Sequence, residues 1–100
     1  MLHTINKSPF EKNSLTTCLR LARPGSDILL LEDGVYGAMP GTKVSEMVES
    51  ALRENKVYAL ASDLASRGID QSSLLRGIEV VDYHGFVELA TRNEKVQSWL

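Results

Sequence analysis

The chain has 100 residues, 43% hydrophobic and 24% charged, which suits one soluble globular domain spanning residues 1–100. Its net charge of -2 comes from 11 basic and 13 acidic residues scattered along the sequence, so direct binding to nucleic acid has little electrostatic support. A single cysteine excludes an internal disulfide, and no apolar run approaches the ~20 residues that cross a bilayer, so no membrane association and a cytoplasmic location are expected.

The first half of the sequence alternates between strand and helix signals. Residues 2–5 are short and β-prone, and residues 10–23 place apolar side chains at helical spacing before Pro24 stops the helix. Residues 28–31 form an uninterrupted apolar run, which is typical of a strand covered on both faces in a parallel sheet. Residues 33–41 are rich in glycine and proline, so a loop is expected there.

The second half repeats this alternation. An apolar stripe after Thr42 predicts a second helix, residues 56–61 predict a third strand, and residues 62–67 predict a short helix that Gly68 ends. The remaining segments are expected to be a turn-like stretch at 69–77, a fourth strand at 78–81, a last helix ending near residue 92, and a tail at 94–100.

Alternation of this kind predicts an α/β fold, a three-layer α/β/α domain around a mostly parallel sheet of four to five strands. Right-handed crossovers would give the domain a flavodoxin-like outline. In such sheets, ligands and partners meet the loops at the carboxyl ends of the strands. The order of the strands does not follow from the sequence.

Cys18 is the only thiol and therefore the only candidate for sulfur chemistry. Its spacing places it on the inward helix face with Leu15 and Leu19, where a cysteine packs as a small, inert hydrophobe. A reactive cysteine usually lies at a loop or a helix N-terminus instead. The spacing favours a packing role and leaves a sulfur-linked role open.

The two histidines, His3 and His84, are separated along the chain, and neither stands at metal-ligand spacing from a second histidine or the cysteine. His3 lies in the first expected strand, where a lone histidine usually has a structural role. No metal site and no cofactor are therefore expected.

Three acids, Glu32, Asp33 and Asp82, lie at or just after the ends of expected strands. Such positions hold magnesium or phosphate in receiver-like α/β domains, although aspartate is also an ordinary turn former. The sequence contains neither a phosphate-binding glycine loop nor a nucleophile elbow. A magnesium- or phosphate-binding domain is therefore an alternative function.

The expected loop after the second strand is unusually apolar, because it contains Val35, Tyr36 and Met39. Exposed apolar residues at a strand-end edge often mark a protein interface. Trp99, in the C-terminal tail, must also pack against either its own domain or a neighbouring subunit. These four residues are the candidate interface residues.

Short segments along nearly the whole chain resemble the DsrH/TusB family. They are Met1-Leu2-His3-Thr4, Lys7-Ser8-Pro9-Phe10, the run from Leu29 to Ala38, Lys56-Val57-Tyr58-Ala59-Leu60, Asp63-Leu64, Arg67-Gly68, and Val81-Asp82-Tyr83 followed by Phe86-Val87. The resemblance implies a DsrE-like α/β fold, which agrees with the outline drawn from the alternation of elements.

The resemblance also implies a function. Members of this family are the smallest of three related subunits, DsrE/F/H or TusD/C/B, which assemble as a hexamer of two heterotrimers. The complex relays persulfide sulfur in the cytoplasm, toward tRNA 2-thiouridine in the Tus branch or through a DsrC-like protein in sulfur oxidation. The expected partners are thus DsrE/TusD-like and DsrF/TusC-like subunits, with a DsrC/TusE-like sulfur acceptor.

Within this family the principal sulfur-carrying cysteine belongs to the DsrE/TusD subunit, so this chain resembles an accessory subunit of a sulfurtransferase complex. The segment from Asn13 to Leu19 is similar to the cysteine-bearing first helix of DsrH-type members. Many TusB-type members lack that cysteine, so the chain resembles the DsrH branch more closely. The resemblance makes Cys18 a candidate sulfur carrier and leaves the packed thiol as the alternative.

Overall fold

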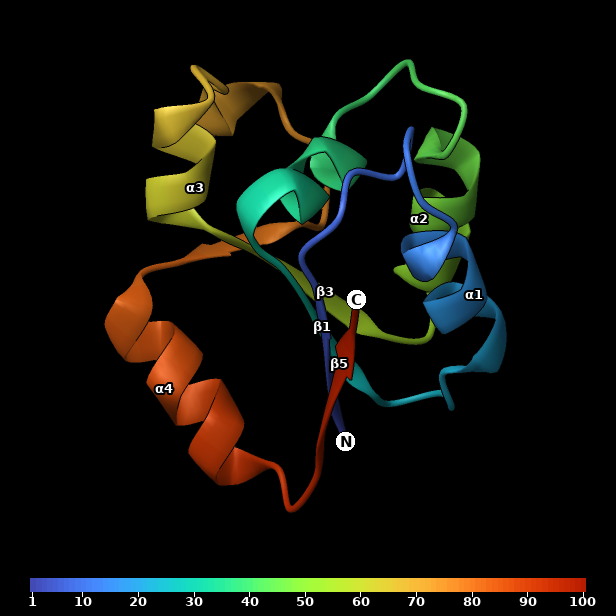
Figure 1. Cartoon of the computed structure of the whole chain (residues 1–100), viewed down its shortest axis with the longest axis vertical. Coiled ribbons are helices and arrows are strands. Elements are labelled where there is room, and N and C mark those ends of the chain that lie inside the picture. The colour runs from blue at the N-terminus through green and yellow to red at the C-terminus, as the bar shows by residue number, and fades with distance from the viewer.

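The structure, a computed structural model, describes residues 1–100 and contains one five-stranded sheet with the strand order β4-β3-β2-β1-β5 (Figure 1). All neighbouring strands are parallel. The strands are β1 (Leu2–Ile5), β2 (Asp27–Leu30), β3 (Lys56–Leu60), β4 (Glu79–Val81) and β5 (Val96–Trp99). The predicted α/β fold with a parallel sheet is confirmed.

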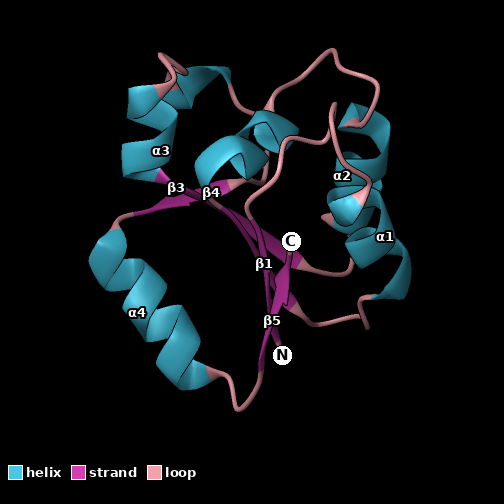
Figure 2. Cartoon of the chain, viewed as in Figure 1, coloured by secondary structure: helices cyan, strands magenta, loops and turns pink.

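Helices cover both faces of this sheet. Figure 2 shows α1 and α2 on one side and α4 on the other, so the molecule has three layers. The helices are α1 (Ser14–Leu21), α2 (Ser45–Ala51), α3 (Ala61–Ser66) and α4 (Tyr83–Arg92), with two 3-10 helices, η1 (Glu32–Ala38) and η2 (Gln71–Ser73). None of the helices combines the length and apolar character needed to cross a membrane.

The core is divided between the two faces of the sheet. A cluster of 14 buried residues, including Cys18 and Leu30, lies on the side of α1 and α2. A smaller cluster of 4 buried residues, including Leu29 and Leu89, lies beneath α4. Successive residues of a strand face opposite sides, so the apolar run of β2 serves both clusters. Each fully buried leucine contributes roughly 1.5–3 kcal/mol.

The segment after β2 is not the exposed loop that its glycines predict. It begins with η1, in which Val35 and Ala38 are three residues apart and fully buried. A 3-10 helix repeats every three residues, so both side chains point into the core together. The expectation that Val35 is exposed is therefore wrong.

The C-terminal residues, expected to form only a tail, form the edge strand β5. It pairs with β1 so that Trp99 is opposite Ile5, and Thr4 Oγ1 donates to Ser98 Oγ at 3.3 Å. Val96, Gln97 and Ser98 are exposed, so the segment lacks the apolar pattern of a buried strand. Its strand conformation comes from pairing with β1.

The other expected elements are present with shifted ends. β2 begins at Asp27 and α3 begins at Ala61, each one residue before the expected element. Gly68 follows α3 with a φ of 67°, the left-handed conformation expected at a helix end. The expected turn-like stretch at 69–77 contains the short 3-10 helix η2.

We expect Gly34→Ala to lower the free energy of unfolding by about 3 kcal/mol in urea denaturation. An alanine Cβ at this position would lie 2.1 Å from the carbonyl oxygen of Ile5, so η1 would have to move away from β1. Gly41→Ala is the matched control, because it meets no atom within 4 Å and adds only the strain of a φ of +73°, about 1 kcal/mol. Equal losses in the two variants would contradict the close packing of η1 on β1.

Candidate functional site

The candidate site is the carboxyl edge of the sheet, where η1 and α3 follow β2 and β3. The chain passes from β2 into η1 over the end of β1, where the Leu31 amide donates to the Ile5 carbonyl at 3.0 Å. Gly34 lies against the same carbonyl, so no side chain separates η1 from β1. This contact fixes the position of the acidic turn at Glu32 and Asp33.

An ion-pair network joins η1 to α3 at this edge. Arg67 Nε donates to Asp33 Oδ1 at 2.8 Å, and Arg67 Nη1 donates to the Asp63 carbonyl at 3.1 Å. The hydrogen bond with Asp33 raises the pKa of the Arg67 guanidinium above its usual range, so this group stays charged. The network joins α3 to η1, although Arg67 and Asp33 are 34 residues apart in the sequence.

Glu32 has a left-handed backbone, with a φ of 50°, and is the one residue other than glycine with a positive φ. This conformation costs a glutamate about 1–2 kcal/mol. Its amide donates to Asp63 Oδ2 at 2.6 Å, which helps to hold the strained turn. Strained residues of this kind concentrate at functional edges, and the Glu32 side chain is exposed to solvent here.

Two of the three acids expected to bind magnesium or phosphate are engaged in other contacts, whereas the Glu32 side chain is exposed. Asp33 pairs with Arg67, and Asp82 Oδ1 accepts from the Gly85 amide at 2.8 Å, which caps the start of α4. No group of three or more histidine, cysteine, aspartate or glutamate side chains is placed to hold one metal ion. The three acids thus do not form a common cluster of metal ligands, since Asp33 forms an ion pair and Asp82 caps a helix.

The four candidate interface residues differ in how far they reach the surface. Val35 is fully buried, whereas Tyr36 and Met39 are half-buried and pack against the larger core cluster. Trp99 is also half-buried, and its Nε1 donates to His3 Nδ1 at 3.0 Å. Trp99 therefore packs on its own chain, and only the outer parts of Tyr36, Met39 and Trp99 can meet a partner.

Cys18 lies in the middle of α1 and is fully buried within the larger core cluster. Burial raises the pKa of its thiol to about 12. At neutral pH the sulfur is therefore a protonated thiol, whereas the thiolate is the nucleophile in sulfur transfer. The geometry of the chain favours the packing role over the carrier role.

The two histidines lie in different environments. His3 is buried in β1, and burial, followed by the N-terminal ammonium, lowers its pKa. His84 is exposed on α4, where its Nε2 lies 2.8 Å from Glu88 Oε1. They lie on different elements, and neither forms part of a metal-binding cluster.

Sequence reasoning missed two polar residues at the carboxyl edge. Arg67 completes the network with Asp33, and the sequence signal for it was its i,i+4 spacing from Asp63. Asn6 follows β1, and its Oδ1 is buried without a hydrogen-bond partner. No local pattern marks Asn6, because its burial depends on η1 packing over the end of β1.

The side chains at the carboxyl edge are charged at the rim and apolar beside it. The charged rim is formed by Glu32, Asp33 and Arg67, beside the half-buried Tyr36. The only thiol of the chain is in the core. The carboxyl edge therefore combines a charged rim with partly exposed apolar side chains and does not include the thiol.

Comparison with known proteins gives consistent matches over the whole chain. The profile of the family described as "DsrH like protein" matches residues 7–96. Protein TusB of Shigella flexneri is 37% identical over 99 residues, which are 99% of this chain and 100% of that protein. With the same coverage, Protein TusB of Escherichia coli (strain K12) is 36% identical and that of Erwinia tasmaniensis is 38% identical.

Two solved structures share the fold. The ychN protein from E. coli superposes with a TM-score of 0.84 at 22% identity, over 97% of each chain. A protein of unknown function from Methanobacterium thermoautotrophicum superposes with a TM-score of 0.76 at 18% identity, over 97% of this chain and 95% of that one. At these identities the likeness concerns the fold alone, and it agrees with the parallel α/β sheet.

A thiol reagent should label Cys18 about a hundredfold more slowly in native buffer than in denaturing urea, because the buried thiol reacts only when the chain opens. Absorbance with an aromatic disulfide reagent measures both rates. A chain with Cys18→Ala and Ser50→Cys is the control, since Ser50 is exposed on α2 and its replacement should react at once. Fast native labelling of Cys18 would show that the thiol reaches solvent.

Proposed function

The chain belongs to the DsrH family, and from that premise we propose that it is an accessory subunit of a cytoplasmic sulfur-relay complex. The match over residues 7–96, together with TusB relatives at 36–38% identity, supports this function. The complex would pass persulfide sulfur from one protein to another. The chain would contribute a binding surface to this relay.

The proposed partners are two related α/β subunits of the DsrE/TusD and DsrF/TusC types, which form a heterohexamer with this chain. A DsrC/TusE-like protein would take sulfur from the complex. The carboxyl edge supports this role because Arg67 and Asp33 make it rigid, with Tyr36 and Met39 half-buried beside them. A preorganised edge loses little conformational entropy when a partner binds.

We propose that the sulfur-carrying thiol belongs to another subunit. Persulfide transfer needs a thiolate that can reach the sulfur donor, and Cys18 is fully buried with a pKa of about 12. In the alternative, Cys18 carries sulfur after assembly moves α1 away from the sheet. The two proposals differ in whether an extra sulfur is found on Cys18.

The destination of the sulfur divides the family into two branches. The relatives named TusB favour transfer toward tRNA 2-thiouridine, whereas the cysteine in α1 resembles the DsrH branch of sulfur oxidation. With a net charge of -2 and no basic cluster, the chain itself is not proposed to contact the tRNA. In either branch it acts through protein partners.

Native mass spectrometry of a tagged copy from the chain's own host tests the proposal. We expect two related α/β subunits in equal amounts with the tagged chain, and no added mass of 32 Da, about one sulfur atom, on Cys18. Isolation of the chain alone or only with itself would contradict the sulfur-relay complex. An added sulfur on Cys18 would instead support the carrier role.

Tyr36→Asp should abolish assembly while the isolated chain stays soluble and folded, because it places a charge among the half-buried residues of the carboxyl edge. Size-exclusion chromatography with the partner subunits measures assembly, and thermal unfolding of the isolated chain monitors the fold. Tyr83→Asp is the matched control, since Tyr83 is 72% exposed on α4. Equal loss of assembly in both variants would contradict the assignment of the interface to the carboxyl edge.

A further inference from the structure

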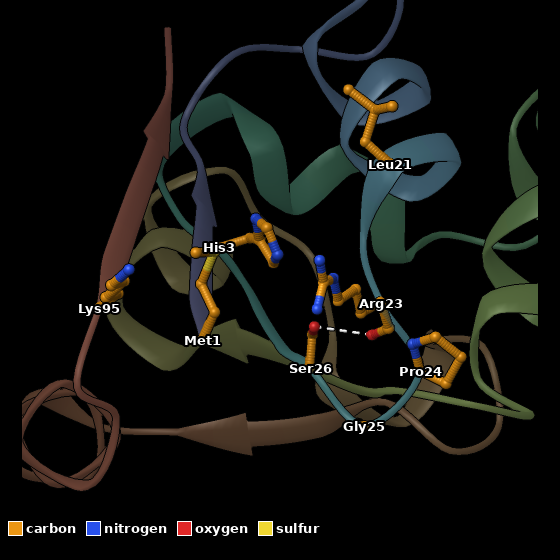
Figure 3. A pocket seen from close by; sticks show the side chains of 8 residues that line it. All are labelled: Met1, His3, Leu21, Arg23, Pro24, Gly25, Ser26 and Lys95. Carbon is orange, nitrogen blue, oxygen red and sulfur yellow. Dashed lines mark hydrogen bonds between the residues drawn. The ribbon is translucent and has the colours of Figure 1, made fainter.

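A pocket of about 570 Å³ lies at the amino edge of the sheet, the end opposite the carboxyl edge. Figure 3 shows that its walls come from segments far apart in the sequence: the start of β1, the turn before β2 and the start of β5. This volume is within the range of pockets that hold small organic ligands, about 300–1,000 Å³.

The charged side chains that line this pocket are all cationic. Arg23 and Lys95 contribute to its walls, and no aspartate or glutamate does. Neither cation forms an ion pair or a side-chain hydrogen bond, although Arg67 and Arg92 elsewhere in the chain are paired. The pocket therefore presents two cations that have no ion-pair partner.

His3 adds a hydrogen-bond donor to the wall of this pocket. The side chain of Trp99 can only donate, so His3 Nδ1 accepts that bond and the ring proton of neutral His3 lies on Nε2. His3 is only 6% exposed, yet its Nε2 has no partner within the chain. Figure 3 shows the His3 ring on the side of β1 that faces Arg23, among the residues that line the pocket.

The turn that carries Arg23 is held by hydrogen bonds. Ser26 Oγ donates to the Arg23 carbonyl at 2.7 Å, and the Ser26 amide lies 3.1 Å from Asn55 Oδ1. The Gly25 amide donates to the Glu54 carbonyl at 2.7 Å, and Gly25 takes a φ of 88° that suits glycine. The backbone that presents Arg23 is thus organised before any ligand binds.

Apolar side chains also line the pocket. Leu21, the last residue of α1, is 63% exposed, and Figure 3 shows it on the helix at one end of the pocket, with Pro24 in the turn on the other side of Arg23. A leucine this exposed provides a surface for the carbon skeleton of a ligand. Polar donors together with an exposed leucine suit a molecule with an anionic head and a short apolar body.

We propose that the amino-edge pocket binds a small organic oxyanion, with its phosphate, sulfate or carboxylate head between Arg23, Lys95 and His3. Arginine and lysine form charge-assisted hydrogen bonds with such oxygens, and the His3 Nε2–H adds a neutral one. The apolar body of the ligand packs against Leu21 and Pro24. The burial that lowers the pKa of His3 keeps the ring neutral at pH 7, which preserves its bond to Trp99.

This inference goes beyond the proposed function and does not depend on it. The pocket lies at the opposite end of the sheet from the carboxyl edge, and residues of this chain alone form it. The isolated chain can therefore be tested without partner subunits. If the pocket binds no oxyanion, the sulfur-relay proposal is unaffected. If the chain joins no sulfur-relay complex, the pocket proposal is unaffected.

The test is an NMR titration of the ¹⁵N-labelled chain with hexyl phosphate, inorganic phosphate and hexanol at low ionic strength. Hexyl phosphate should shift the amides of Gly25, Ser26 and Lys95, and it should bind about tenfold more tightly than either fragment. The His3 Nε2 resonance should move while the ring remains neutral. Absence of binding, or equal binding of hexanol, would overturn the proposal.

Variants that each remove one positive charge then test whether Arg23 and Lys95 bind the anionic head. Arg23→Gln and Lys95→Gln should each weaken the binding of hexyl phosphate about tenfold, because each removes a charge-assisted hydrogen bond. Arg76→Gln is the matched control, since Arg76 is exposed and does not line this pocket, and it should change affinity less than about twofold. Equal weakening by all three variants would show that the anion responds only to net charge and would overturn the proposed site.

Discussion

The burial of β1 between β2 and β5 is the constraint on which both ends of the sheet depend. Every residue of this strand is buried, and it pairs on both sides in parallel. At its carboxyl end, the Ile5 carbonyl accepts from Leu31 and lies against Gly34, which places η1. At its amino end, His3 accepts from Trp99 and faces the amino-edge pocket. This one interior strand thus positions both the carboxyl edge and the amino-edge pocket.

The sequence predicts those parts of the fold that depend on local pattern. The apolar run in β2 is recognisable because a parallel strand buried on both faces cannot alternate. Cys18 is found in the core as the helical spacing of α1 indicates. β5 could not be predicted in this way, because three of its four residues are exposed and only pairing with β1 makes it a strand. In η1, tertiary packing likewise overrides glycines that locally favour a loop.

The candidate sites follow the same division between local and distant determinants. Asp33 and Asp82 do lie at strand ends, but their roles were set by an arginine 34 residues away and by the start of a helix. Single-sequence reasoning finds where an acid lies along the chain and cannot find which cation it meets. The amino-edge pocket has no sequence signature at all, since His3, Arg23 and Lys95 come together only when β1 lies between its two neighbours.

The burial of the only thiol bears on how such a subunit can contribute to a relay. A thiol with a pKa of about 12 is almost wholly protonated at neutral pH, so it is a poor acceptor or donor of persulfide sulfur. Exposing Cys18 would also disrupt the core beneath α1, where it packs with Leu15 and Ile28. A chain of 100 residues has a free energy of unfolding of only about 5–15 kcal/mol. Losing the packing beneath α1 would remove a large fraction of that free energy. The same packing that stabilises the fold therefore opposes sulfur chemistry at Cys18, and it favours a subunit that acts through its surfaces.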